Sequence, residues 1–126
     1  MKFYYNGKLM RTSKTHEYKF AIVWQNGKCA SCHGTLEAAE KEYRKQIAES
    51  ETCIDRYKQA IKAIQNGKKS FIFKERSGSY KVELYGEDFA HNDRSKAETW
   101  EKYMESANEC IARLKTRKIV ELEARA

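Results

Sequence analysis

Apolar and polar residues alternate over residues 17–25, EYKFAIVWQ, which indicates a β-strand. The apolar side chains that share one face of this strand are Tyr18, Phe20, Ile22 and Trp24. Asn26-Gly27 follows, a pair that favours the tight type I′ hairpin turn, and a second short strand is expected over residues 29–33. Residues 1–34 are therefore predicted to form a small antiparallel sheet.

The apolar spacing changes to threes and fours after residue 34, which predicts a long helix. Thr35 suits the N-cap position and Asn66-Gly67 is a stop signal, so the helix is expected over residues 35–66. At about 1.5 Å per residue, such a helix is roughly 48 Å long. Its apolar seam consists of Leu36, Ala39, Tyr43, Ile47, Ser50, Ile54, Tyr57, Ile61 and Ile64.

The remainder of the chain predicts a hairpin over residues 70–85, a second helix over 95–117 and a closing strand over 118–124. The seam of the second helix consists of Ala97, Trp100, Met104, Ala107, Ile111 and Leu114. This order predicts an α+β fold in a single domain, residues 1–126, with the two helices packed as an antiparallel pair.

The second helix is too short to cover the whole seam of the first. Ala39 and Ser50 are small seam residues, which suit the close approach of another helix. We therefore expect a homodimer or a higher homo-oligomer, in which a second copy of the chain covers the rest of the seam. The alternative is that the hairpin turns back over it.

Composition and charge narrow the class of protein. The chain of 126 residues has no Pro and only six Gly, which favours long unbroken helices. Its 25 basic and 18 acidic residues give a net charge of +7, which favours an anionic partner such as nucleic acid, a nucleotide or an acidic protein surface.

No apolar run approaches the roughly 18 residues of a membrane span, and the start MKFYYNGK lacks the apolar region of a signal peptide. We expect a cytoplasmic protein without a membrane partner, with its four Cys as thiols.

The pentapeptide CASCH, residues 29–33, matches the C-x-x-C-H pattern of covalent haem attachment. Its strand-like setting and the lack of an export signal argue against haem. A redox dithiol and simple packing in a tight hairpin both remain open. A zinc site would need a second pair of ligands, whereas Cys53 and Cys110 stand alone beside apolar seam positions. We predict neither a metal nor another cofactor.

No constellation of catalytic residues stands out. His16, His33 and His91 are scattered, and the sequence has no carboxylate pair at a catalytic spacing, no G-x-G-x-x-G loop and no Walker loop. We therefore predict that the protein is not an enzyme. An enzyme that uses the Cys29 and Cys32 thiols is the alternative.

The stretch RLKTRKIVELEAR, residues 113–125, carries the clearest binding signal. Arg113 and Arg117 are four residues apart on the expected helix, so they share a face. Two guanidinium groups on one face can hold a pyrophosphate through several charge-assisted hydrogen bonds. From spacing alone, cations that complement the C-terminal end of a helix explain the pair equally well.

Aromatic and polar residues that could complete a nucleotide site are spread along the chain. The loop GEDFAHND, residues 86–93, could lie near the same end of the molecule as the arginines, with Phe89 as a stacking face and Asn92 as a reader of a base or ribose edge. Tyr85 and Trp24 are further stacking candidates. Core packing is the alternative for each aromatic residue.

Basic residues interleave with aromatic ones in MKFYYNGKLMRTSK and KKSFIFKER, a composition that suits single-stranded nucleic acid or RNA. No RNP, KH or zinc-finger pattern accompanies these segments. Nucleic-acid binding is therefore the wider alternative to a small nucleotide ligand.

The opening KFYYNGKLMRTSKTHEYKFAIV, the segment SCHGT, the long helix and the closing IVELEAR resemble a family of phage anti-defence proteins, over most of the chain by layout. These proteins are the sponges that counter the Thoeris defence system. The resemblance implies a non-enzymatic homo-oligomer, built from a small sheet and two helices, that sequesters cyclic ADP-ribose isomers. The ligand would lie in a pocket between protomers.

The resemblance also implies roles for individual residues. Arg113 and Arg117 would bind the phosphates of the ligand. Asn92 would contact a polar edge of the ligand, and either Phe89 or Tyr85 would stack on the adenine.

By the same resemblance, a second site for cyclic oligonucleotides would involve the hairpin turn near Gly27 and Ala30, with Arg56 from the long helix. We therefore expect a phage protein in the cytoplasm of the host cell that binds a cyclic nucleotide immune signal without cleaving it. The alternative is an inhibitor that binds an RNA or a nuclease component, as anti-CRISPR proteins do.

Overall fold

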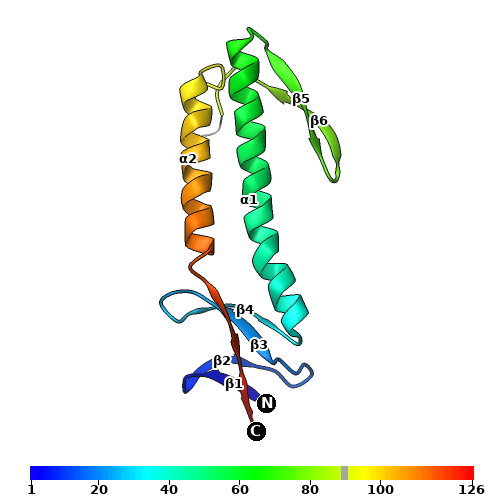
Figure 1. Ribbon diagram of the computed structural model, residues 1–126, viewed down its shortest axis with the longest axis vertical. Coiled ribbons are helices and arrows are strands. Elements are labelled where there is room, and N and C mark those ends of the chain that lie inside the picture. Colours follow the sequence, from blue (N-terminus) through cyan, green and yellow to red (C-terminus); the bar gives the residue numbers. More distant parts are fainter. Residues whose placement is uncertain (89–90) are drawn as a thin grey trace. The chain divides into compact units, whose positions relative to one another are not determined.

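The computed structural model describes residues 1–88 and 91–126 (Figure 1). Two helices and three small antiparallel sheets make up these residues, so the predicted α+β class is confirmed. The chain divides into two compact units. Unit 1 combines Met1–Ile47 with Ala112–Ala126, and unit 2 is the continuous segment Ala48–Ile111.

The first helix, α1, spans Leu36–Gln65 and matches the predicted long helix closely. The Thr35 hydroxyl oxygen accepts a hydrogen bond from the Ala38 N–H at 3.1 Å, which caps the first turn. At the other end, Gly67 adopts a φ of 69°, a left-handed conformation that suits glycine and stops the helix.

The second helix, α2, spans Ala97–Leu114 and is shorter than predicted at both ends. Its last turn tightens, because the Thr116 hydroxyl donates to the Arg113 carbonyl at 2.6 Å and the Arg117 N–H donates to the Leu114 carbonyl. Arg117 therefore lies beyond the helix, and the prediction that it shares a helical face with Arg113 is wrong. No helix in the described residues is both long enough and apolar enough to cross a membrane.

The closing segment forms two short strands instead of the single predicted one. Around Leu122, whose N–H donates to the Lys19 carbonyl at 2.8 Å, the chain passes from one sheet of unit 1 to the other. Sheet A has the order β2 (Lys8–Thr12), β1 (Lys2–Tyr5) and β8 (Glu123–Arg125), and sheet B has the order β4 (Cys29–His33), β3 (Phe20–Val23) and β7 (Lys118–Glu121). The closing segment thus ties both sheets of unit 1 together (Figure 1).

Strand β3 is covered on both faces. Ala21, Ile22 and Val23 have no exposed surface, and Ala21 and Val23 pack with Cys32 and Val120 in the core of unit 1. The alternation in the sequence predicted only one buried face. Tyr18 and Trp24, the outer members of the predicted apolar face, lie outside the strand.

In unit 2 the two helices pack as an antiparallel pair. Tyr57 lies against Trp100, with ring centroids 5.9 Å apart, whereas the earlier residue Ser50 approaches the later residue Cys110. The core of this unit consists of Ala60, Ala63, Leu84 and Trp100, and the hairpin of β5 (Ser70–Glu75) and β6 (Gly78–Glu83) adds Phe71 and Val82.

Part of the helix seam remains half-buried in this single chain. Ile54, Met104, Ala107 and Ile111 each retain some exposed surface. The expected coverage by a second copy stays a prediction.

Candidate functional site

Trp24 lies at the start of the hairpin loop between β3 and β4, directly after Val23. The Trp24 N–H donates to the Lys28 carbonyl, and the Gly27 N–H donates to the Trp24 carbonyl, each at 2.9 Å. Only Gly27 in this loop has a positive φ, 84°, whereas a type I′ turn needs two such residues. The predicted two-residue turn is therefore wrong. The loop has three central residues, Gln25 to Gly27, and the Asn26 side-chain oxygen accepts the Lys28 N–H at 3.0 Å.

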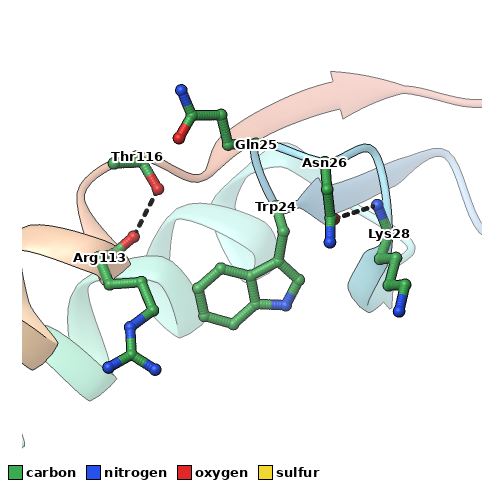
Figure 2. A pocket seen from close by; sticks show the side chains of 6 residues that line it. All are labelled: Trp24, Gln25, Asn26, Lys28, Arg113 and Thr116. Atoms are coloured by element: carbon green, nitrogen blue, oxygen red, sulfur yellow. Dashed lines mark hydrogen bonds between the residues drawn. The ribbon is translucent and has the colours of Figure 1, made fainter.

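This hairpin loop and the end of α2 border an open surface pocket of about 650 Å³ within unit 1, which we name the Trp24 pocket (Figure 2). Its volume is in the range of sites for small molecules. Figure 2 shows the indole of Trp24 between Arg113 on one side and Asn26 and Lys28 on the other. The pocket is lined by Trp24, Gln25, Asn26, Lys28, Arg113 and Thr116.

The cations of the Trp24 pocket are open to a ligand. The ion pairs found within residues 1–88 and 91–126 involve neither Arg113 nor Lys28, and both side chains belong to exposed residues. A guanidinium group binds phosphate oxygens through two parallel hydrogen bonds, and an indole offers a stacking face to a base. The pocket therefore has the groups that an anionic ligand with an aromatic ring requires.

Arg117 lies behind the pocket instead of inside it. The residue is only 4% exposed, and its guanidinium donates to the Leu114 carbonyl at 2.9 Å, the Gln46 side-chain oxygen at 2.9 Å and the Tyr43 carbonyl at 3.0 Å. The Cζ atom of the Arg117 guanidinium lies 5.5 Å from the centroid of the Trp24 ring and 4.8 Å from the centroid of the Tyr43 ring. Arg117 therefore contacts the indole from within unit 1, and the expectation that it binds phosphate stays a prediction.

The charge of Arg117 still matters for the pocket. All three of its hydrogen-bond acceptors are neutral, and no ion pair with a carboxylate forms in the described part of the chain. Unit 1 as a whole contains 14 of the 25 Lys and Arg residues but only 6 of the 18 Asp and Glu residues. The resulting positive potential favours an anion near Arg113.

Two of the expected site residues, Tyr85 and Asn92, belong to unit 2 and do not line the Trp24 pocket. Tyr85 is 51% exposed and borders a separate cavity of about 530 Å³, together with Lys68 and Lys69. The Asn92 N–H donates to the Asp88 carboxylate at 2.9 Å. A third expected residue, Phe89, lies outside the described residues.

The loop over residues 86–93 was expected near Arg113. Its described residues, 86–88 and 91–93, belong to unit 2, whereas Arg113 belongs to unit 1, so this proximity stays a prediction.

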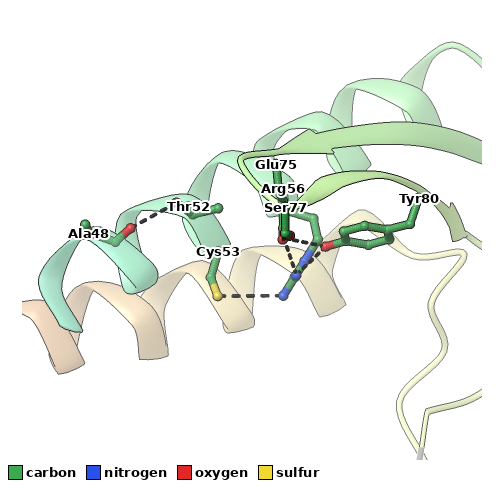
Figure 3. A network of polar contacts seen from close by, with 7 residues as sticks. All are labelled: Ala48, Thr52, Cys53, Arg56, Glu75, Ser77 and Tyr80. Atoms are coloured by element: carbon green, nitrogen blue, oxygen red, sulfur yellow. Dashed lines mark hydrogen bonds and ion pairs between the residues drawn. The ribbon is translucent and has the colours of Figure 1, made fainter. Parts of the chain in front are cut away.

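The three residues expected at a second ligand site are not gathered within one unit. Gly27 lies in the hairpin loop of unit 1 and Ala30 is exposed on β4, whereas Arg56 belongs to unit 2. The Arg56 guanidinium donates to the Tyr80 hydroxyl oxygen at 2.7 Å and lies 3.7 Å from the Glu75 carboxylate (Figure 3). Its hydrogen-bonding capacity is therefore partly used within unit 2.

Gln25, Asn26, Lys28 and Thr116 line the pocket but were not predicted as site residues. These residues could have been predicted only from the pairing of β3 with β7. Val23 faces Lys118 in that register, which brings the residues after Val23 next to those before Lys118. Periodicity within each segment does not reveal which strands pair.

The described residues contain no group of three or more His, Cys, Asp or Glu side chains that could hold a metal ion. In the CASCH segment, the His33 ring lies 2.8 Å from the Ser31 hydroxyl.

The chain was compared with models of known protein families, with curated proteins and with solved structures, and none of the three comparisons found a match. The interpretation of the site therefore rests on its own residues and geometry.

Proposed function

We propose that this protein binds a phosphate-bearing nucleotide in the Trp24 pocket and holds it without chemical change. The observation that carries the proposal is that an indole and two cations without carboxylate partners in the described residues line one cavity. A base would stack on Trp24, and phosphates would bind Arg113 and Lys28. The exposed amide of Gln25 would contact polar edges of the ligand.

The lining of the pocket supports binding over catalysis. It contains no carboxylate, imidazole or thiol group, so the lining offers no such general base to activate the Thr116 hydroxyl or the Lys28 amine. A binding protein needs none of these, because reversible binding lowers the free ligand concentration according to the protein concentration and the dissociation constant.

We further propose that the ligand is a cyclic nucleotide immune signal, a cyclic ADP-ribose isomer, and that the protein is a phage anti-defence sponge that acts in the host cytoplasm. The adenine and the pyrophosphate of such a ligand match the stacking face and the paired cations of the pocket. The resemblance to the sponges of the Thoeris system points to the same class. Cyclic oligonucleotides also carry bases and phosphate groups, and we propose them as further ligands.

A neighbouring copy of the chain would complete the pocket in this proposal. Tyr85 and Asn92 belong to unit 2 and are not among the residues that line the Trp24 pocket, so in this proposal a second protomer supplies them. The half-buried side chains of Ile54, Met104 and Ala107 offer an apolar surface on which two copies could pack.

Titration calorimetry of the full chain against cyclic ADP-ribose isomers tests the proposal. We expect heat of binding, and after heat denaturation the released ligand should elute unchanged in chromatography. Arg113→Ala should weaken binding about 10- to 100-fold, because it removes charge-assisted hydrogen bonds to phosphate. The matched control is Arg44→Ala, which removes an exposed cation of the same unit.

The absence of heat and of retained ligand would reject this function. Equal binding by Arg113→Ala and the unmodified chain would instead reject the Trp24 pocket as the binding site.

A second candidate is an inhibitor that binds RNA or a nuclease component, and the surface of unit 1 favours it. Cations lie over aromatic rings at Arg125 and Tyr4, 4.5 Å apart, and at Arg11 and Tyr18, 4.9 Å apart. Such interleaving suits single-stranded nucleic acid. This candidate predicts affinity for a macromolecule that falls steeply with salt, whereas a small ligand that meets two or three cations predicts a shallower dependence.

A further inference from the structure

Strand β4 brings the thiols of Cys29 and Cys32 into contact through a β-bulge. In a regular strand, residues three apart point to opposite faces. Here Ile22 faces Ser31 but Val23 faces Cys29, so Ala30 is an additional residue without a cross-strand partner. The bulge turns both cysteines to the same face, with their Sγ atoms 3.4 Å apart.

The two thiols differ in their surroundings. Cys32 is only 9% exposed and packs in the core of unit 1, whereas Cys29 is half-buried at the edge of that core. Burial and the neighbouring Cys29 raise the pKa of Cys32 to about 12, against the opposing effect of Arg11. Cys29 is therefore the more accessible thiol, and Cys32 is a thiol kept protonated beside it.

The other two cysteines have no such partner. The Cys53 sulfur accepts a hydrogen bond from Arg56 at 3.7 Å, and the Cys110 sulfur accepts one from Ser50 at 3.9 Å. Both lie on helices of unit 2, and the described residues place no thiol at hydrogen-bonding distance from either. Among the four cysteines, only Cys29 and Cys32 are arranged as a pair.

We propose that Cys29 and Cys32 form a reversible disulfide by exchange with a low-molecular-weight disulfide such as oxidised glutathione. Cys29 loses its proton and its sulfur attacks one sulfur of the oxidant, whose S–S bond breaks and releases one glutathione thiol. Cys32 then loses its proton and attacks the Cys29 sulfur, which releases the second glutathione thiol. Two protein thiols are oxidised, and one glutathione disulfide is reduced to two thiols.

The geometry favours this second step. A disulfide bond is about 2.05 Å long, so the two sulfurs must approach by roughly 1.4 Å. Ala30 is exposed and unpaired, so the bulge can adjust without the loss of a ladder pair. Burial is the larger cause of the raised pKa of Cys32 and remains, whereas conversion of Cys29 to a mixed disulfide removes the contribution of the Cys29 thiol.

Oxidation would act directly beside the Trp24 pocket. Lys28, which lines the pocket, precedes Cys29, and its carbonyl accepts the Trp24 N–H. A disulfide at the base of the hairpin is therefore expected to change nucleotide affinity. This consequence rests on the proposed function, whereas formation of the disulfide does not.

Mass spectrometry after equilibration of the native protein in glutathione redox buffers tests the disulfide. Trypsin cleaves after Lys28 and Lys41, so one peptide contains both cysteines. We expect this peptide, kept unreduced, to become lighter by two hydrogen masses as the buffer becomes oxidising. The double variant Cys53→Ser/Cys110→Ser should behave identically.

Single variants test the order of the two steps. Cys32→Ala should accumulate glutathione on Cys29, because the thiol that resolves the mixed disulfide is missing, whereas Cys29→Ala should leave the buried Cys32 unmodified. If Cys32→Ala fails to fold, maleimide labelling of the unmodified chain serves instead, and Cys29 should react faster than Cys32.

Persistence of both thiols in every buffer, while the urea-unfolded chain forms the disulfide, would overturn the proposal. Faster modification of Cys32 than of Cys29 would also overturn it. Disulfide formation without any nucleotide binding in either redox state would reject the proposed function and leave the redox pair intact.

Discussion

Arg56 of unit 2 and Arg113 of unit 1 differ in the contacts that their side chains make. In unit 2, Arg56 contacts Tyr80 and Glu75, and the Tyr80 hydroxyl in turn donates to the Glu75 carboxylate at 2.8 Å (Figure 3). In unit 1, Arg113 borders a cavity and forms no ion pair within the described residues (Figure 2). Arg56 is held by its own unit, whereas Arg113 is left for a partner.

The charge balance of the two units extends this contrast. Unit 2 contains 11 basic and 12 acidic residues, a net charge of −1, whereas the 14 basic and 6 acidic residues of unit 1 give +8. Three of the four ion pairs recorded for the described residues lie in unit 2. The net charge of +7 is thus a property of unit 1, and an anionic partner is expected to bind there.

The largest expected effect is that of Arg117→Ala on stability. The substitution removes three side-chain hydrogen bonds and the guanidinium group that contacts the rings of Trp24 and Tyr43, so the free energy of unfolding should fall by about 3–4 kcal/mol. Urea unfolding followed by fluorescence measures the change. Arg44→Ala is the matched control and should alter the free energy by less than about 0.5 kcal/mol. Equal midpoints for the two variants would show that Arg117 does not support the pocket.

The next largest expected effect is a loss of nucleotide affinity, without a loss of stability, when Arg113 is replaced. Arg113→Ala should lower nucleotide affinity about 10- to 100-fold and leave the urea midpoint unchanged, because the side chain is exposed and forms no ion pair in the described residues. Calorimetry and urea unfolding of the same preparation measure both quantities. A large loss of stability would contradict the view that this arginine is free for a ligand.

A smaller effect is expected in unit 2, at the hydroxyl that joins Arg56 to Glu75. Tyr80→Phe should lower the free energy of unfolding by about 0.5–1 kcal/mol, since the network is partly exposed. Nucleotide affinity at the Trp24 pocket should not change. Tyr85→Phe removes the hydroxyl of an exposed tyrosine and serves as the control for stability. If Tyr80→Phe is as stable as this control, the Arg56 network does not stabilise unit 2.

The smallest effect concerns the carboxylate of Asp93 in unit 2. Its side chain accepts hydrogen bonds from the Ser95 hydroxyl at 2.6 Å and the Ser95 N–H at 2.9 Å, which lower its pKa below 3.8. Because the folded-state pKa is lowered, the stability that the carboxylate contributes is present above pH 3.8 and is lost as the pH falls through the lower value. A carboxyl titration by NMR should give a higher pKa in Ser95→Ala. An unchanged pKa would mean that Ser95 does not stabilise the charged form.

The sequence predicts the long helix well because its signals are local. Thr35 caps α1 and Asn66-Gly67 ends it, close to where the pattern placed these boundaries. The end of α2 was placed too late, although the predicted apolar seam already ends at Leu114, the last residue of the helix. Beyond Leu114, the Thr116 hydroxyl donates to the Arg113 carbonyl in place of a regular helical hydrogen bond. Because the helix ends before Arg117, this residue is buried instead of lying on the helix face where it was predicted.

The candidate site is less accessible to sequence reasoning. Trp24 and Arg113 were both named as ligand residues, but nothing local brings them together. Their proximity depends on the pairing of β3 with β7, in which Val23 faces Lys118. Lys28 and Thr116 were missed for the same reason, since each gains its role only from that pairing.

The pairing of distant segments in unit 1 also has a consequence for folding kinetics. Strand β1 pairs with β8, so that Lys2 faces Arg125, whereas unit 2 is one continuous segment with its hairpin and helix pair close in sequence. Closing such a long loop costs entropy before any contact compensates for it, and folding slows as the sequence separation of contacts grows. Unit 2 is therefore expected to fold early and to shorten the effective loop that unit 1 must close. The Trp24 pocket, which needs the β3–β7 pairing, would then be among the last features of the molecule to form.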